Sequence, residues 1–248
     1  MLRSASSHYA RSALLARRAG IAAGSAPNAL ALASILTVHQ ATQARMSEQY
    51  VADVLTEQGT DVTPSGSLVP LAFTTDGRMF SDMAAKATNV GRLVESLVQD
   101  AGRSAESVAS AARPLVGHAR YLSPPSCSRC AVLAGRVYRY SDGFKRHTNC
   151  DCVMIPAAED AAPGLVSDPT DLIREGKVTG LSKADLRAIV EDGADLGKVV
   201  NVRRYSSGLR ESGRTLARAG KLTPEGIYRL ASDRTEAVTM LRRFGYLT

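Results

Sequence analysis

Four cysteines and one histidine lie within the 26 residues from 127 to 152, and this cluster constrains the fold more than any other sequence feature. The pattern is Cys127-x2-Cys130-x16-His147-x2-Cys150-x-Cys152, and it contains every cysteine of the chain. Two cysteines separated by two residues form a tight turn that can direct both thiolates at one ion, and a second pair from a later segment completes a tetrahedron. The spacing therefore predicts a small module that closes around one structural zinc ion (Zn2+).

Five candidate ligands compete for four positions around this ion. We expect Cys127, Cys130, His147 and Cys150 to bind it, and Cys152 to replace His147 if the imidazole faces outward. Cys152 ranks behind Cys150 because two cysteines separated by one residue cannot always reach the same ion. No convincing secretory leader precedes the cluster, so two disulfides or buried thiols are the weaker alternative. Four protein ligands would leave no position for water, and the predicted site is therefore structural.

Sequence motifs of the common enzyme classes are missing. No histidine is followed by x-Glu, as zinc nucleobase deaminases require, and the zinc-protease and nucleotide-binding motifs are absent as well. A metal-dependent nuclease would need further histidines and acidic residues near His147, and no partner histidine is close in sequence. A serine protease stays open because its residues need not be adjacent in the chain. The sequence thus favours a protein without catalytic activity, with a protease or a nuclease as the alternative.

Composition and periodicity predict a mainly helical chain. The chain is 44% hydrophobic but only 5% aromatic, and it has no Trp, so Ala, Leu and Val must form most of the core. Such a core suits packed helices better than a large sheet. We expect helices over residues 8–22 and 29–58. A further helix is predicted by apolar residues that recur at spacings of three and four, namely Met83, Ala87, Val90, Val94, Leu97 and Ala101.

The connections between elements are marked by turn and cap residues. A short connection at Asp100–Arg103, followed by Ser104 as a cap, predicts an antiparallel helical hairpin. Between the cysteine pairs, Arg136–Tyr140 alternates and is followed by a turn signal at 141–143, which predicts a β-hairpin. In the last third, the expected helix starts and stop are Ser182, Thr223 with Pro224 after it, Asp233 and Gly245.

The expected fold class is therefore mainly α with a small β-hairpin zinc-binding module (α+β). We divide the chain into a helical N-terminal region (1–120), a Cys/His zinc-knuckle module (121–160) and a helical, basic C-terminal region (161–248).

Residues 1–47 contain five arginines and no acidic residue, which is typical of a mitochondrial transit peptide or of an Ala/Arg-biased bacterial or phage protein. We favour the second because the bias continues beyond residue 47. The apolar run at 29–38 is shorter than the roughly 20 residues that span a bilayer, so no membrane span is expected.

The positive charge of the chain is concentrated near its end. The formal net charge is +7, and residues 197–248 hold 11 of the 31 basic residues but only 4 of the 24 acidic ones. A glycine-interrupted basic segment accounts for most of this excess: Arg203, Arg204, Arg210, Arg214, Arg218 and Lys221. Flexible cationic chains suit phosphates better than base edges, which predicts non-specific, salt-dependent binding of double-stranded DNA. A solvated basic tail, or contact with an acidic protein surface, is the alternative.

The run from Ser126 to Pro156 resembles the cysteine–histidine segment of Mu F-like minor head proteins of tailed phages, especially those of actinobacterial phages. The shared pattern is a CxxC, a Leu-Ala-Gly step, a Phe, a basic residue, a His and a closing CxC. The matching positions are Cys127, Cys130, Leu133 to Gly135, Phe144, Arg146, His147, Cys150 and Cys152. Thr148 departs from the pattern, since a Pro commonly follows the His. Residues 178–201 and 222–248 are also similar to this family, so the resemblance covers about residues 105–248.

The resemblance implies a minor capsid protein that acts in phage head morphogenesis. A few copies would lie in the virion, in the capsid interior near the portal, and take part in packaging or delivering DNA. Portal or capsid proteins are the implied partners, and the host cytoplasm is the implied place of assembly. Some members of the family are described as capsid maturation proteases or as fused to them, which makes a maturation protease the enzymatic alternative.

Overall fold

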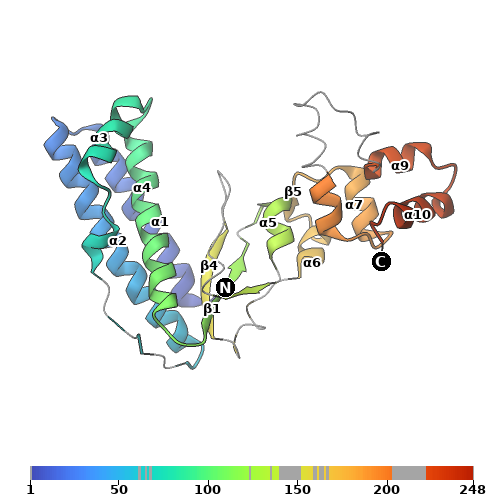
Figure 1. The fold of residues 1–248 in the computed structure, drawn as a ribbon, viewed down its shortest axis with the longest axis horizontal. Helices are drawn as coiled ribbons and strands as arrows, with labels where there is room; N and C mark the ends of the chain where they lie inside the picture. The colour runs from blue at the N-terminus through green and yellow to red at the C-terminus, as the bar shows by residue number, and fades with distance from the viewer. Residues whose placement is uncertain are drawn as a thin grey trace. The chain divides into compact units, whose positions relative to one another are not determined.

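The structure is a computed structural model, and it describes residues 2–60, 63–64, 66, 69–122, 124–134, 136–139, 152–158, 161, 165, 168–202 and 222–247. The chain forms two compact units, each assembled from separate segments. Unit 1 comprises Met1–Ala119, Val137–Lys145 and Met154–Leu165, and unit 2 comprises Arg120–Arg136, Arg146–Val153 and Val166–Thr248. The described residues are mostly helical with a few short strands, which confirms the mainly α class with a small β component (Figure 1).

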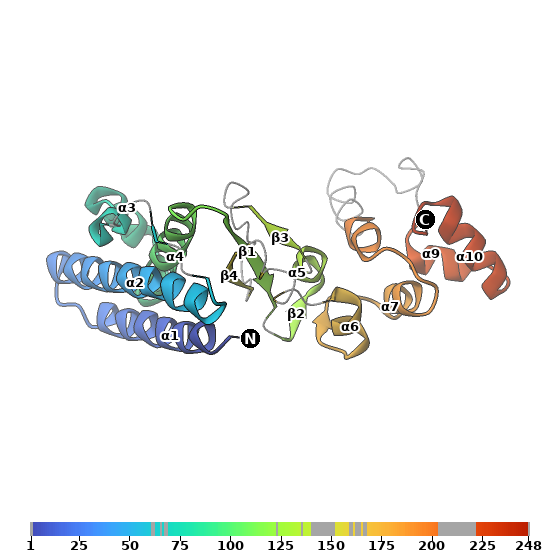
Figure 2. The ribbon, with the colours of Figure 1, turned by 90° about the horizontal axis from the view of Figure 1, so that it is seen from below.

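Unit 1 is built on three helices that pack along their lengths: α1 (Arg3–Gly24), α2 (Ala29–Glu57) and α4 (Val90–Ala111). Figures 1 and 2 show these helices side by side. The 3-10 helix η1 (Pro70–Phe73) and the short α3 (Gly77–Lys86) lie between α2 and α4 in sequence. Small and aliphatic side chains dominate the core of the bundle, as the composition predicts: Ala16, Ala19, Ala23, Leu36, Phe80, Val94 and Val98. None of the described helices combines the length and the apolar composition needed to span a bilayer.

Polar side chains define where the helices of unit 1 begin. Asn28, Asp76 and Asn89 accept hydrogen bonds from first-turn amides of α2, α3 and α4. The start of α1 is capped from another helix, because the Arg3 and Ser4 amides donate to the two oxygens of Glu57 at 2.8 and 2.9 Å. A carboxylate at this position also interacts favourably with the positive end of the helix dipole. Glu57 therefore ties the end of α2 to the beginning of α1.

The predicted helical hairpin at Asp100–Arg103 is wrong. Helix α4 runs without interruption from residue 90 to 111, and the break in the helical pattern comes earlier, at residues 87–89. Gly102 lies inside α4 and packs against α2. A Cβ on residue 102 would come within 2.6 Å of the side-chain amide nitrogen of Gln43 on α2. A glycine in this place allows close helix packing and does not end the helix.

A sheet of three strands lies mostly in unit 1. The strand β1 (Val116–Tyr121) is central, with β3 (Val137–Tyr138) and β4 (Val153–Ala158) on either side. β3 runs antiparallel to β1 and places Tyr138 opposite His118. The predicted strand between the cysteine pairs is confirmed at β3, and its partner among the described residues is β1. The predicted turn at 141–143 lies outside the described residues.

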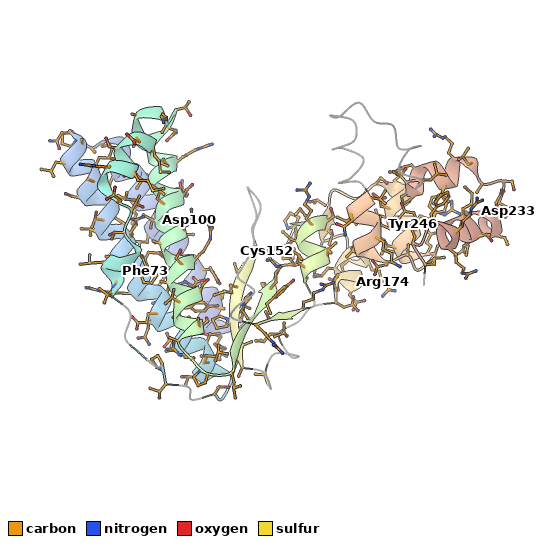
Figure 3. All side chains as sticks on the ribbon, viewed as in Figure 1. Phe73, Asp100, Cys152, Arg174, Asp233 and Tyr246 are labelled. Atoms are coloured by element: carbon orange, nitrogen blue, oxygen red, sulfur yellow. The ribbon has the colours of Figure 1, made fainter. Side chains whose placement is uncertain are left out.

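Unit 2 contains short helices around a core of aliphatic side chains. The helices are α5 (Ser128–Leu133), α6 (Pro169–Arg174), α7 (Lys183–Val190), α9 (Pro224–Leu230) and α10 (Arg234–Arg243), and residues 196–202 are also helical. The core consists of Ile173, Ala188, Ile189, Ala194, Val199, Val202, Ile227, Ala237, Leu241 and Tyr246. Tyr246 is buried in this core, and its hydroxyl donates to the Leu222 carbonyl oxygen at 2.6 Å (Figure 3).

The helix starts and the stop predicted in the last third are confirmed. Ser182 forms a capping box with Asp185 at the start of α7, and Thr223 caps α9, in which Pro224 is the first residue. Asp233 accepts from the Glu236 amide at the start of α10. Gly245 follows α10 with a φ of 72°, a conformation that glycine adopts without strain.

Candidate metal centre

The two cysteines of the CxxC turn lie together at the start of α5. Cys127 ends the strand β2 (Ser126–Cys127) and is the N-cap of α5, and Cys130 lies in its first turn. Their Sγ atoms are 3.4 Å apart. This distance is longer than a disulfide bond of about 2.05 Å. It is close to the roughly 3.8 Å that separates two thiolates bound to one tetrahedral zinc at about 2.3 Å.

The CxxC turn is held in place by a strand pair. β2 runs parallel to β5 (Val178–Thr179), with Cys127 opposite Thr179. The Ser126 amide donates to the Lys177 carbonyl oxygen at 2.9 Å, and the Thr179 hydroxyl donates to the Ser126 carbonyl oxygen at 3.3 Å. The position of Cys127 is therefore set by pairing with a segment far along the chain as well as by its local turn.

The surroundings of the two sulfurs differ. Cys130 is buried, whereas Cys127 is half-buried. α5 also contacts α6, and its Val132 side chain lies against Gly197, where a Cβ would be 3.7 Å from Val132 Cγ1. The CxxC turn is thus part of the packed structure of unit 2. Two soft sulfur donors at this separation fit two of the four positions around a zinc ion.

The other predicted ligands are only partly described. Cys152 is buried and immediately precedes β4, as labelled in Figure 3. His147 and Cys150 lie outside the described residues. Within the described part of the chain, no group of three or more His, Cys, Asp or Glu side chains could hold a metal. The structure therefore brings Cys127 and Cys130 together and assigns neither a third nor a fourth ligand.

The predicted DNA-binding residues also lie outside the described residues. This applies to all six of them: Arg203, Arg204, Arg210, Arg214, Arg218 and Lys221. The described chain ends before them in the helical residues 196–202 and resumes at Leu222, just ahead of α9. The DNA contact stays a prediction.

The helical bundle of unit 1 contains a buried polar cluster that no sequence motif marks. His8 Nε2 lies 2.9 Å from Glu106 Oε1, and these side chains are only 2% and 3% exposed. The Ser47 hydroxyl donates to the same oxygen at 3.4 Å, and the Tyr9 hydroxyl lies 3.2 Å from Oε2. The His8 ring stacks on Tyr50 with centroids 4.2 Å apart. Groups from α1 and α2 therefore surround the Glu106 carboxylate, which compensates for its burial.

This polar cluster also holds the beginning of β4. The Tyr9 and Tyr50 hydroxyls donate to the Met154 carbonyl oxygen at 2.6 and 3.1 Å. Gln58 Nε2 donates to the Pro156 carbonyl oxygen at 2.7 Å. Burial, followed by the Glu106 charge, raises the pKa of both tyrosines well above the ordinary value. Since Met154 follows Cys152 by two residues, these bonds fix the chain just after the last cysteine.

Sequence reasoning missed this cluster because its members are far apart in the chain. Tyr9 and Glu106 are separated by 97 positions, so no local pattern connects them. One signal was present: Glu106 falls on the same face of α4 as the buried Val98 and Ala109. A charged residue within an apolar stripe indicates a buried partner, although it does not say which one.

Comparison with known proteins places part of the chain in a protein family. A family model described as VG15 protein matches residues 36–175, which is more than half of the chain. The matched residues include all five candidate metal ligands and exclude both α1 and the basic segment at 203–221. No curated protein and no solved structure shows significant similarity to the chain.

Proposed function

The chain belongs to the VG15 protein family, whose match points to a phage-encoded protein, and from this premise we propose that it is a minor head protein of the Mu F-like type. In this role it acts in head morphogenesis, with portal or capsid proteins as partners. The observation that carries the proposal is the CxxC turn, with its sulfurs 3.4 Å apart, within the family-matched residues. The resemblance of residues 126–156 to the cysteine–histidine segment of Mu F-like proteins supports the same role.

We further propose that a structural zinc ion closes the module. Cys127 and Cys130 supply two ligands, and the others come from His147, Cys150 and Cys152. The ion would join the turn at 127–130 to the segment at 147–152, which closes a loop of the chain. Structural zinc can contribute on the order of 10 kcal/mol to folding, so a chelator is expected to unfold the module.

Metal analysis of the purified full chain tests the zinc proposal. We expect one zinc ion per chain, and its loss in Cys127→Ser and Cys130→Ser, because each removes one of the paired sulfurs. The zinc content of His147→Ala and of Cys152→Ser identifies the fourth ligand, because the variant that lacks this ligand loses zinc. His39→Ala is the matched control, because His39 lies on α2, outside the cluster. Substoichiometric zinc in the wild-type chain, or full zinc in both Cys127 and Cys130 variants, would contradict the proposal.

The role in the head is tested with the phage itself. We expect the chain in purified virions, detected by mass spectrometry, and fewer DNA-filled heads when its gene is deleted. The host cytoplasm is the expected site of assembly and the capsid interior the final location. Virions that lack the chain, together with normal head formation in the deletion, would refute the proposed function.

The enzymatic alternative is tested separately. The His8–Glu106 pair is too deeply buried to touch a substrate, and it does not favour catalysis. Incubating the purified chain with capsid subunits and with plasmid DNA separates the alternatives. We expect no cleavage product, whereas a cut subunit or a nicked plasmid would indicate a maturation protease or a nuclease.

A further inference from the structure

One side of α1 is exposed and carries large apolar side chains among arginines. Leu14 and Ile21 are 50% and 65% exposed, and Arg11, Arg17 and Arg18 are exposed as well. With 3.6 residues per turn, these five side chains fall within an arc of about 120°. We call these five residues the α1 outer face. The opposite side of α1 packs into the bundle through Ala16, Ala19 and Ala23.

The α1 outer face has no negative charge near it in sequence. Residues 1–47 contain no acidic side chain, and Glu48 is the first. Arg17 and Arg18 form no ion pair with any residue that the structure describes. Three arginines and two large apolar side chains are thus presented to the outside, and no described residue forms an ion pair with these arginines. Exposed apolar groups bordered by charge are typical of interaction surfaces.

We propose that the α1 outer face docks onto a partner protein whose surface presents carboxylates around an apolar patch. Leu14 and Ile21 would contact the apolar patch, and the arginines would pair with the carboxylates around it. Arginine suits this position because its planar guanidinium binds a carboxylate through two hydrogen bonds, and arginine is enriched at protein interfaces.

Other occupants fit the α1 outer face less well. A second copy of the chain would bring arginines opposite arginines, which repel. DNA would use the arginines but gain nothing from the two apolar side chains at the centre, because its backbone is recognised by charge. Helices that lie on membranes bury a broad apolar face rich in Leu, Phe and Trp. The α1 outer face presents two large apolar side chains, and Tyr9 of α1 faces the buried cluster.

This inference rests on the proposed function, because that function supplies the proteins with which it is tested. The portal protein and the major capsid protein of the same phage are each purified, and their direct binding to the full chain is measured at low and high salt. We expect one of them to bind. The double variant Arg17→Glu and Arg18→Glu should weaken that binding about tenfold or more, because it places like charges in contact. Arg92→Glu makes a single charge reversal of the same kind on α4, at an exposed position, and should leave the affinity unchanged.

Cross-linking locates the contact independently of affinity. A photoreactive residue is introduced as Ile21→p-benzoylphenylalanine, and in a control as Leu230→p-benzoylphenylalanine, since Leu230 is similarly exposed at 59%. We expect the bound protein to be captured from position 21 and not from position 230. Circular dichroism of every variant verifies that the helices are retained.

Several results would overturn the inference. The first is that neither phage protein binds the chain, and the second is that the α1 variants leave the binding unchanged. The third is that the α1 variants instead alter the retention of plasmid DNA or of anionic phospholipid vesicles. A chain that carries zinc and is found in virions, but whose α1 outer face binds neither protein, refutes this inference alone. Absence of the chain from virions refutes the proposed function.

Discussion

At the scale of single residues, Glu106 has the greatest influence on the interior of unit 1. Its carboxylate accepts from the Ser47 hydroxyl and lies within hydrogen-bond distance of His8 and Tyr9. Glu106, His8 and Ser47 are shielded from water. A buried carboxylate is tolerated only when its hydrogen bonds are made, and its partners then depend on it in turn. The same cluster reaches the Met154 carbonyl oxygen through two tyrosines, so a change at residue 106 affects β4 as well.

We predict that Glu106→Ala lowers the free energy of unfolding by about 3 kcal/mol, because His8 and Ser47 lose their shared acceptor inside the bundle. Urea unfolding followed by circular dichroism measures the loss. Asp100→Ala, at an exposed position on the same helix, should change stability by less than about 0.5 kcal/mol. Equal effects of the two substitutions would show that the cluster contributes little.

The raised pKa values of Tyr9 and Tyr50 predict a loss of stability at alkaline pH. In the unfolded chain these hydroxyls ionise near pH 10, and folding raises both pKa values above that. The neutral tyrosines therefore stabilise the fold fully below about pH 10, and this contribution disappears as the pH rises toward the folded pKa values. Tyr50→Phe should lose less stability between pH 9 and 11 than the wild type. Identical losses in both proteins would contradict the prediction.

The same substitution has a second, pH-independent effect. At neutral pH, Tyr50→Phe should cost about 1 kcal/mol, because it removes the hydrogen bond to the Met154 carbonyl oxygen. Comparing the variant with the wild type at each pH separates this constant loss from the alkaline one.

At the scale of secondary-structure elements, the helices follow from local signals where those signals are strong. The caps at Ser182, Thr223 and Asp233 begin helices as predicted, because each acts on amides within its own first turn. The same reasoning failed for α4, where Gly102 and Ser104 resemble a helix break but lie inside a continuous helix. Tertiary packing outweighed the local preference there, since Gly102 gives space to Gln43 of α2.

The crossing of α1 and α4 depends on two glycines. A Cβ at Gly20 would lie 2.8 Å from the Gly91 carbonyl oxygen, and a Cβ at Gly91 would lie 2.7 Å from the Gly20 carbonyl oxygen. Both obstacles are backbone atoms, so the helices themselves must move apart to admit a methyl group. The closest approach of these helices is therefore possible only without side chains at these positions.

We predict that Gly20→Ala lowers the free energy of unfolding by about 1–3 kcal/mol, through overpacking at this crossing. Gly24→Ala is the matched control on the same helix, because a Cβ there meets nothing within 4 Å. That substitution should be neutral or slightly stabilising, since alanine loses less backbone entropy than glycine on folding. Thermal unfolding of both variants measures the difference, and a stabilised Gly20→Ala would disprove the close approach.

At the scale of the whole molecule, the chain forms two compact units. The two units consist of interleaved segments, because β1 pairs with both β3 and β4, which come later in the chain. The division into a helical N-terminal region (1–120), a zinc-knuckle module (121–160) and a basic C-terminal region (161–248) stays a prediction. Net charge, by contrast, is a property of the whole chain that sequence alone gives, and its excess lies in the last 52 residues.

The location of that charge predicts that the chain binds DNA through the segment at 203–221. Replacing the six basic residues of the segment at 203–221 with alanine should abolish most binding to double-stranded DNA and flatten its salt dependence. The slope of log K against log salt falls by about 0.9 for each phosphate contact that is lost. Fluorescence anisotropy with a labelled duplex at several salt concentrations measures this slope.

The α1 double variant Arg17→Glu and Arg18→Glu is the control for DNA binding, because the α1 outer face is assigned to a protein partner. It should keep most of the wild-type DNA affinity. Zinc-loaded wild-type protein without DNA affinity at low salt would contradict the predicted DNA contact.

By itself, the sequence determined the features that act over a few residues: the CxxC turn, the helix starts at their caps, the small-residue core and the charge of each segment. Only the tertiary structure decided which distant groups meet. It placed Glu106 beside His8, Gly20 against Gly91, and Cys127 on the strand pair with β5. The physical reason is that caps and turns satisfy hydrogen bonds within one turn of chain, whereas buried pairs and close crossings arise only once the topology has brought separate segments together.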